Sequence, residues 1–164
     1  AFLVRKKINY YISRNETDKL MAEINAAIDA DPENPDNAQY YSIRGNLYEQ
    51  MKQEDKAIES YKKAIELNDE SYDAHWNIGA LLIGKANELV KTVGVNGVTM
   101  EQVKGKTKQL YTDAKPHLEK AAENMEYSDK DKRDLYKNLK RIYDNLGDKA
   151  NSDRVAQMIK ELEG

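Results

Sequence analysis

The sequence contains no cysteine, which excludes disulfide bonds, thiolate metal ligands and cysteine nucleophiles. It has only 3 prolines and 8 glycines in 164 residues, and no apolar run approaches the ~18 residues that a membrane-spanning helix needs. Hydrophobic residues make up 40% and charged residues 34% of the chain, which is typical of a helical protein with many solvated faces. The length is that of one domain of ordinary size.

The net charge bears on the partners of the chain, and the first residues bear on its origin. The net charge of −3 gives no overall attraction to nucleic acid or to an anionic membrane, so we expect no nucleic-acid partner. The apolar run Ala1 to Val4 is too short, and lacks the preceding basic region, to be a signal peptide. Because the chain also begins without methionine, we interpret it as a fragment of a longer chain whose compartment is unknown.

A repeated pattern lies on two predicted helices separated by "MKQED". The first helix reads Tyr41-x2-Arg44-Gly45-x2-Tyr48 and the second reads Ala57-x3-Tyr61-x2-Ala64. Small residues at these positions allow two antiparallel helices to approach closely, and the tyrosines fill the adjoining space. The pattern resembles the tetratricopeptide (TPR) repeat, with Arg44 in place of the usual leucine.

The same spacing recurs along the rest of the chain with substituted residues. A capping box, Ser128-x-x-Asp131, is predicted to open one of the later helices. The resemblance implies an all-α, TPR-type α-solenoid of four antiparallel helix pairs, forming a single superhelical domain. The expected units are about 1–36, 37–70, 71–127 and 128–164.

The third unit carries an insertion. The interval from Gly79 to Ala114 is much longer than the corresponding interval from Gly45 to Ala57, and about 23 residues are inserted relative to the repeat pattern. Apolar residues continue at helical spacing through the insertion. Both helices therefore run on, by about 11 residues each, into an antiparallel hairpin arm over about 84–112 that projects roughly 17 Å.

The arm has further predicted features. "VGVNGV" forms its tip, and Pro116, inside the returning helix, predicts a bend near Thr112. A long-armed unit of this kind resembles one found in bacterial envelope TPR proteins, and this resemblance favours the bacterial periplasm or envelope as the location, although the cytoplasm stays possible.

Motifs for catalysis or metal binding are incomplete. Gly105-Lys106-Thr107 matches the end of a phosphate-binding loop, but Met100 occupies the position of the first glycine and no strand precedes it. Thr99-x-x-Gln102 is instead typical of a capping box, which places Gly105 inside a helix. The two histidines, His75 and His117, are expected to pack or to cap a helix, since no third ligand accompanies them. We predict no catalytic residue, metal or cofactor.

Partner-binding candidates follow from the resemblance, which implies that the first helix of each pair lines a concave groove. The residues off the packing face of these helices are Arg5, Asn9, Gln39, Ser42, Asn46, Asp73, Trp76, Asn77, Asp134, Asn138 and Arg141. The four asparagines are suited to bind the backbone of an extended peptide, and Trp76 offers a large apolar contact. Alternatively, Trp76 packs on the next unit and the asparagines are only solvated.

The arm is locally basic. Six lysines and three acidic residues between Gly84 and Lys115 give it a charge of +3 and leave −6 on the remainder. Lys104, Lys106 and Lys108 are therefore candidates for contact with an anionic surface. The alternative is that these lysines only solvate a helix face.

The interpretation favoured by these patterns is a non-catalytic scaffold that holds a protein or peptide partner in its groove. A second hypothesis is a structural role, in which the arm or the end helices mediate self-assembly into a homo-oligomer. Contact of the basic arm with an anionic surface is a third.

Overall fold

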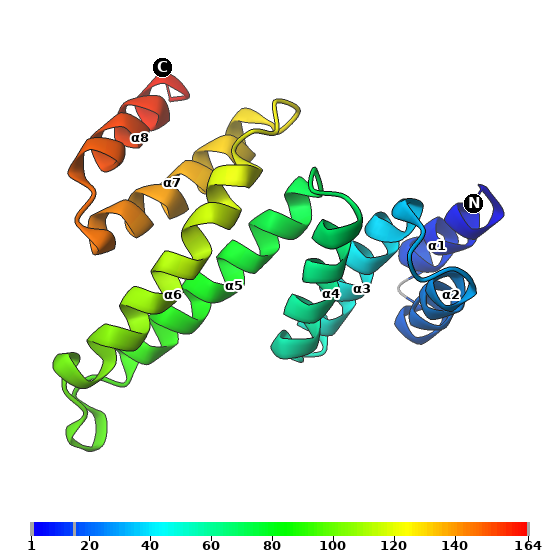
Figure 1. The fold of residues 1–164 in the computed structure, drawn as a ribbon, viewed down its shortest axis with the longest axis horizontal. Helices are drawn as coiled ribbons and strands as arrows, with labels where there is room; N and C mark the ends of the chain where they lie inside the picture. Colours follow the sequence, from blue (N-terminus) through cyan, green and yellow to red (C-terminus); the bar gives the residue numbers. More distant parts are fainter. Residues whose placement is uncertain (1, 15, 164) are drawn as a thin grey trace. The chain divides into compact units, whose positions relative to one another are not determined.

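The structure, a computed structural model, describes residues 2–14 and 16–163, and the side chains of residues 2–5, 8 and 9 lie outside the described part. Within these residues the chain forms eight α-helices and two short 3-10 helices and no β-strand (Figure 1). The elements are α1 (Phe2–Arg14), α2 (Thr17–Ala30), η1 (Pro35–Asn37), α3 (Ala38–Gln50), α4 (Glu54–Leu67), α5 (Tyr72–Lys91), η2 (Val95–Gly97), α6 (Met100–Ala121), α7 (Asp129–Leu146) and α8 (Lys149–Glu161).

The helices pack in adjacent pairs, and the chain divides into two compact units, Ala1–Ala74 and His75–Gly164. In the first unit α1 packs on α2, α2 on α3, and α3 on α4. In the second unit α6 packs on α7 and α7 on α8, while Gly79 on α5 lies against Leu118 on α6. This arrangement confirms the predicted TPR-type fold of helix pairs.

Gly45 and Tyr61 show why the repeat pattern folds this way. A Cβ atom at Gly45 would lie 2.3 Å from Cε1 of Tyr61, so only glycine lets α3 approach the Tyr61 ring on α4. The Tyr61 side chain is completely buried, and its hydroxyl lies within hydrogen-bond distance of the side chains of Asn46 and Glu49 on α3. The ring is therefore held by packing on one side and by hydrogen bonds on the other.

Arg44, which replaces the usual leucine, is accommodated at the edge of this core. Its guanidinium lies 4.7 Å from the centre of the Tyr41 ring, and its Nε donates to the hydroxyl of Ser60, which is buried, at 3.3 Å. The stem of arginine packs on apolar surface while its charged group keeps polar partners. The substitution thus retains a contact between α3 and α4.

The core of the second unit lies among α5, α6, α7 and α8. Its buried members are Ile83, Ala86, Tyr111, Ala114, Leu118, Ala121, Leu135, Leu139, Ile142, Tyr143 and Val155. A Cβ atom at Gly79 would lie 2.5 Å from Cγ and Cδ2 of Leu118, so this glycine provides the space that Leu118 fills. The second glycine of the repeat pattern therefore has the same physical role as Gly45.

The arm is present, but its two helices are lengthened unequally. Relative to the matching alanines Ala57 and Ala114, α6 begins about 11 residues earlier than α4 does, as predicted. Relative to the matching glycines Gly45 and Gly79, α5 ends only about 7 residues later than α3 does. The predicted extension was therefore wrong for α5, which is lengthened by about two turns and projects about 10 Å.

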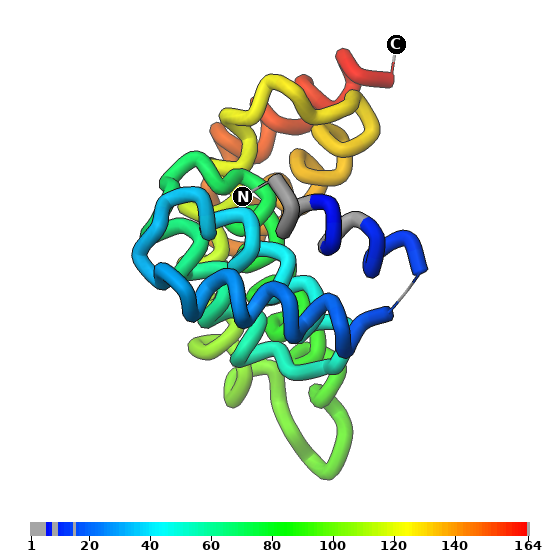
Figure 2. Tube along the Cα trace, turned by 90° about the vertical axis from the view of Figure 1, so that its right-hand side faces the viewer, coloured from blue at the N-terminus to red at the C-terminus, as the bar shows by residue number. Residues whose placement is uncertain are grey.

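The turn between α5 and α6 takes up the remaining inserted residues. Gly94, Asn96 and Gly97 have φ angles of +85°, +50° and +78°, which interrupt a right-handed helix. Residues 92–99 form the connection, which extends beyond the ends of α5 and α6 (Figure 2). The sequence placed the turn correctly but did not show how many residues it needs.

The returning helix α6 starts as predicted. The Thr99 amide donates to Oε1 of Gln102 at 2.7 Å, which confirms the capping box. Gly105 lies inside α6, where it cannot form a phosphate-binding loop. α6 is continuous through Pro116, which lacks the N–H that would bond to the carbonyl of Thr112. The bend expected there stays a prediction.

The capping box that opens α7 provides a test of local stability. The Ser128 hydroxyl accepts from the Asp131 amide at 3.2 Å and donates to the Asp131 carboxylate at 2.6 Å. Replacing Ser128 with alanine removes this N-cap and is expected to lower the free energy of unfolding by about 1 kcal/mol. Urea denaturation would measure the change, and Ser13→Ala in the exposed last turn of α1 is a matched control. A loss no larger than that of the control would contradict the capping role.

Candidate partner-binding site

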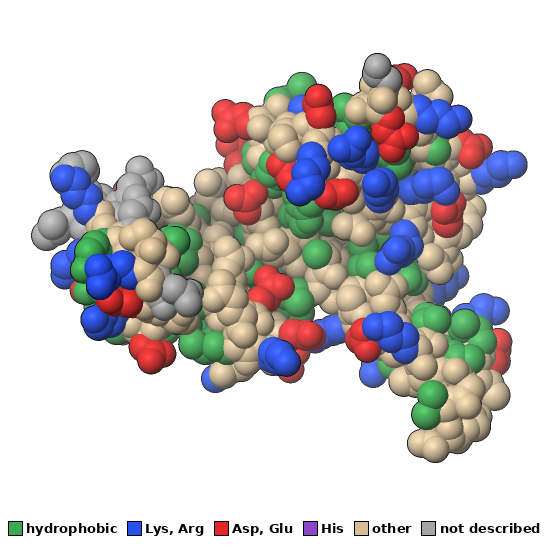
Figure 3. Space-filling model, turned by 180° about the vertical axis from the view of Figure 1, so that it is seen from behind, with side chains coloured by type: hydrophobic (Ala, Val, Ile, Leu, Met, Phe, Trp, Pro, Cys, Tyr) green, Lys and Arg blue, Asp and Glu red, His purple; other side chains and the backbone are tan. Residues whose placement is uncertain are grey.

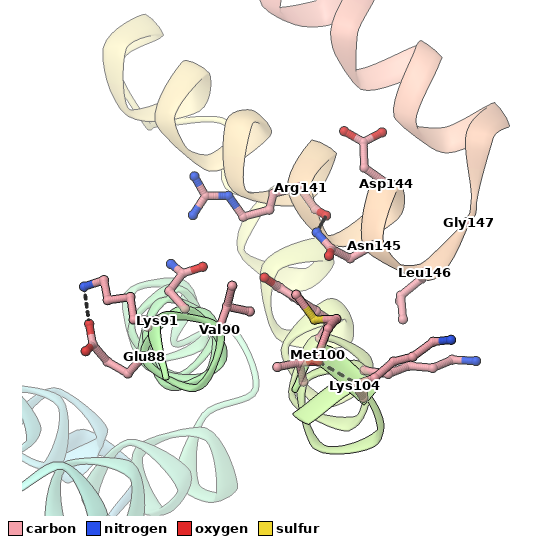
Figure 4. A pocket seen from close by; sticks show the side chains of 15 residues that line it. Glu88, Val90, Lys91, Met100, Lys104, Arg141, Asp144, Asn145, Leu146 and Gly147 are labelled. Atoms are coloured by element: carbon pink, nitrogen blue, oxygen red, sulfur yellow. Dashed lines mark hydrogen bonds and ion pairs between the residues drawn. The ribbon is translucent and has the colours of Figure 1, made fainter. Parts of the chain in front are cut away.

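A cavity of about 1050 Å³ opens in the second unit between the arm and the C-terminal end of α7 (Figure 4). Its lining residues come from α5, α6, α7 and the turn that follows α7. They are Gly84, Asn87, Glu88, Val90, Lys91, Met100, Lys104, Thr107, Lys108, Tyr111, Arg141, Asp144, Asn145, Leu146 and Gly147.

The cavity exists because the arm is longer than the helix that packs beside it. On α5, residues 84, 87, 88 and 91 recur at the spacing of one helix face. On α7, the helix ends at Leu146, and Gly147 adopts a left-handed conformation with φ +77° that turns the chain into α8. The face of α5 and α6 that α7 would otherwise cover is therefore left open.

Part of the lining is apolar and accessible. Val90 is 38% and Met100 49% exposed, and Leu146 on the α7 side is half-buried. Met100 lies at the centre of the site in Figure 4, with Val90 beside it. Exposed apolar side chains within a concave site favour a ligand that removes them from water.

The acidic residues of the lining are already neutralised. Glu88 forms an ion pair with Lys91 at 2.5 Å. Asp144 accepts from Lys140 at 2.7 Å and also from the Ser152 hydroxyl. These two hydrogen bonds, first that of Lys140, hold the pKa of the Asp144 carboxyl below its ordinary value. Both carboxylates therefore have cationic or hydroxyl partners within the chain.

Three basic residues of the lining lack a close acidic partner. Lys104 lies 3.9 Å from Glu101, which is too far for a hydrogen bond, so this ion pair is weaker than that of Glu88 and Lys91. Lys108 and Arg141 form no ion pair with any residue that the structure describes. The cavity consequently has a net positive character.

The sequence-predicted groove residues are only partly brought together. In the second unit, Arg141 lines the cavity. Asn138 lies on the same face of α7 as Arg141, and Asn77 precedes Gly84 by two turns on α5; both asparagines are half-buried. Neither asparagine is among the residues that line the cavity, and their binding role stays a prediction.

Six of the predicted groove residues belong to the first unit. Gln39 is exposed, the Ser42 hydroxyl donates to the carbonyl of Ala38 at 3.1 Å, and Asn46 accepts from Tyr61. Asp73 is exposed near the start of α5. The side chains of Arg5 and Asn9 lie outside the described residues. A continuous ladder of asparagines across both units stays a prediction.

Trp76 packs within its own unit. Its ring lies edge-to-face with Tyr127 at a centroid distance of 5.1 Å, and it is partly buried against the core of the second unit. Trp76 therefore packs, as the alternative interpretation expected, but its partner is Tyr127 in the connection between α6 and α7. A hot-spot role for its remaining exposed surface stays a prediction.

Several lining residues were not predicted from the sequence. Gly84, Asn87, Val90, Met100 and Asn145 line the cavity but were not among the candidates. The available signal was the insertion itself, since a helix pair longer than its neighbour must leave one face uncovered. Gly84 and Glu88 follow Asn77 at helical spacing on the same face of α5, so this pattern would have predicted them.

The predicted basic residues of the arm do not all line the cavity. Lys104 and Lys108, one turn apart on α6, both line the cavity, whereas Lys106 faces away from it. The tip, residues 92–99, has no charged side chain, and the space-filling view shows it as mainly uncharged surface (Figure 3). The positive charge is thus concentrated along the arm rather than at its end.

The two histidines are in contact. Nδ1 of His75 lies 3.0 Å from Nδ1 of His117, so one ring donates and the other accepts. Among the described residues no group of three or more His, Cys, Asp or Glu side chains is arranged to hold a metal ion. The pair joins α5 to α6 near the base of the arm, in agreement with the expected packing role.

Antiparallel helix pairs that follow one another along the chain define a helical-repeat protein. Residues 38–71, which contain the α3–α4 pair, match the tetratricopeptide repeat family. A comparison with curated protein sequences finds no significant match. Within the described residues no helix is both long and apolar enough to cross a membrane.

Solved structures resemble this chain. PilF of Pseudomonas aeruginosa is 15% identical, with a TM-score of 0.63, and the match covers 98% of this chain and 60% of PilF. A MamA structure is 17% identical with a TM-score of 0.45, covering 98% of this chain and 88% of MamA. BtubC from P. vanneervenii is 18% identical with a TM-score of 0.41, covering 98% and 78%. The chain therefore shares the fold of PilF and spans less than two thirds of its length.

Proposed function

We propose that this chain is a non-catalytic scaffold that holds a segment of a partner protein in the cavity between the arm and α7. TPR proteins are in general protein-interaction scaffolds. The observation that carries the more specific proposal is the cavity itself. At about 1050 Å³, it lies at the upper end of the ~300–1000 Å³ typical of ligand sites, so it has room for several side chains of a peptide.

The chemistry of the lining suits a peptide. Val90 and Met100 offer apolar surface, whereas Asn87 and Asn145 offer amides that both donate to and accept from a peptide backbone. Asn77 and Asn138, on the same two helices, continue the polar surface away from the cavity. Binding through shape and hydrogen bonds on a preformed surface requires no cofactor.

Gly84 provides a direct test of the cavity. A Cβ atom at Gly84 meets nothing within 4 Å, so Gly84→Phe is expected to fill the cavity without disturbing the core. Peptides selected by the chain from a random peptide library displayed on phage should bind Gly84→Phe at least about tenfold more weakly, because the ring occupies their site. Isothermal titration calorimetry would measure the affinities.

Gly105→Phe is the matched control. Gly105 is also an exposed glycine inside a helix of the arm with nothing within 4 Å of its Cβ position, but it does not line the cavity. Peptides should bind this variant as they bind the unmodified chain. Equal binding to both variants, or no selected peptide at all, would overturn the proposal. A dimer that dissociates only in Gly84→Phe would instead assign the cavity to self-assembly.

A further inference from the structure

The structure points to the kind of segment that the cavity accepts. Building on the function proposed above, we infer that the occupant is an acidic segment in which Asp or Glu residues lie on both sides of an apolar residue. The inference depends on how charge and apolar surface are distributed over the lining, and it names a partner chemistry that the fold alone does not imply.

Charge complementarity is the first argument. The negative side chains of the lining are satisfied within the chain, Glu88 by Lys91 at 2.5 Å and Asp144 by Lys140 at 2.7 Å. What remains for a ligand is the positive charge of Lys104, Lys108 and Arg141. Hydrogen bonds from such groups to carboxylates are stronger than those between neutral groups.

The second argument is the position of these charges. Lys104 and Lys108 lie one turn apart on α6, whereas Arg141 lies on α7, across the cavity. In Figure 4 the Arg141 and Lys104 side chains extend to opposite sides, and Met100 lies between them. A segment crossing the site therefore meets positive charge, then apolar surface, then positive charge again. Acidic residues flanking an apolar residue match this order.

The amides of the site define how the backbone of the segment is held. Asn87 is half-buried, and its side chain makes no hydrogen bond with any residue that the structure describes. Asn145 is oriented by the bond from its Nδ2 to the carbonyl of Arg141 at 2.8 Å, which directs its amide oxygen away from α7. Together they offer a donor and acceptors for main-chain groups of a peptide.

A peptide fits these observations better than other anionic partners. The apolar and positive groups line a concave site, which matches an extended segment better than the flat surface of a bilayer. Single-stranded nucleic acid requires exposed aromatic rings for stacking, but Tyr111, the aromatic side chain of the lining, is only 5% exposed. Lys106 would contribute to contact with either surface, yet it lies outside the cavity.

The test uses phage-displayed random peptides with the intact chain. The enriched peptides are expected to carry at least two Asp or Glu residues around a Leu, Ile or Met. One enriched peptide is then synthesised with blocked termini, together with a version in which Asn and Gln replace Asp and Glu. The acidic peptide should bind at least about tenfold more tightly, and its affinity should fall as NaCl rises from about 0.05 to 0.5 M.

Charge reversal in the chain completes the test. The double variant Lys108→Glu, Arg141→Glu should weaken binding of the acidic peptide at least about tenfold, while Lys106→Glu, on the same helix, should leave it nearly unchanged. Both sites are exposed, so folding should be retained, which thermal melting followed by circular dichroism would check. The neutral pair Lys108→Gln, Arg141→Gln should give an intermediate loss.

The outcomes separate this inference from the function on which it depends. If neutral and acidic peptides bind equally well and both are blocked by Gly84→Phe, the cavity binds peptides but the acidic preference is wrong. If Gly84→Phe blocks neither peptide, the proposed function itself fails. Equal losses in Lys106→Glu and in the double variant, with binding to vesicles of phosphatidylserine and phosphatidylcholine, would assign the lysines to an anionic surface and overturn the inference.

Discussion

Replacing Leu118 with alanine is expected to lower the free energy of unfolding of the second unit by about 2–5 kcal/mol. Leu118 is completely buried among α5, α6 and α7, and its branches fill the space that Gly79 leaves. Removing them creates a cavity whose walls are fixed by helices and cannot fully collapse. Trp76 is the only tryptophan and lies in this unit, so its fluorescence during urea denaturation reports the change.

A substitution at Gly79 tests whether Leu118 stabilises the unit by filling the space beside this glycine. Alanine at Gly79 forces a Cβ atom to within 2.5 Å of Leu118 and is expected to destabilise the unit by about 1–3 kcal/mol. When Leu118 is also replaced with alanine, the new Cβ atom at residue 79 no longer meets a leucine side chain. The loss of stability caused by Gly79→Ala should then largely disappear. A double-mutant cycle measures this coupling. If the two effects simply add, the two residues do not fill the same space.

Replacing Gly45 with alanine should destabilise the first unit by about 1–3 kcal/mol. The new Cβ atom would lie 2.3 to 2.7 Å from three atoms of the Tyr61 ring. The ring is fully buried, and its hydroxyl is held by Asn46 and Glu49, so it cannot move aside easily. Urea denaturation followed by far-ultraviolet circular dichroism measures the loss.

Gly105→Ala is the control for this prediction, because the same change there is expected to stabilise the chain. Gly105 is inside a helix with nothing within 4 Å of its Cβ position, so alanine there is expected to stabilise the chain by about 0.5–1 kcal/mol through helix propensity. If Gly45→Ala is also neutral or stabilising, then close approach of α3 to Tyr61 is not what selects glycine at this position.

The fold was predictable because each repeat has local requirements that the sequence displays. Glycine at 45 and 79, alanine at 57 and 114, and apolar residues at helical spacing identify the helix pairs without knowledge of distant contacts. The insertion likewise predicted an arm. Its proportions were not predictable, because the length of α5 depends on where the left-handed residues of the turn begin.

The candidate site was less predictable, because it depends on the relative lengths of neighbouring helices. Arg141 was among the predicted groove residues and lines the cavity, whereas Asn87 and Met100 also line it but were not predicted. Trp76 was assigned to the groove because it lies off the packing face of its helix, whereas its contact with Tyr127 depends on how the connection between α6 and α7 folds. A location in the bacterial envelope stays a prediction.

The unequal lengths of the paired helices have a consequence for how binding sites diversify in such chains. Two turns of helix contain about seven residues, so adding or removing two turns from both α5 and α6 keeps the same faces toward α7. The repeat core built around Gly79 and Leu118 lies at the other end of these helices and is untouched. The length of the arm can therefore change how much of a bound segment is covered, independently of the residues that hold the fold together.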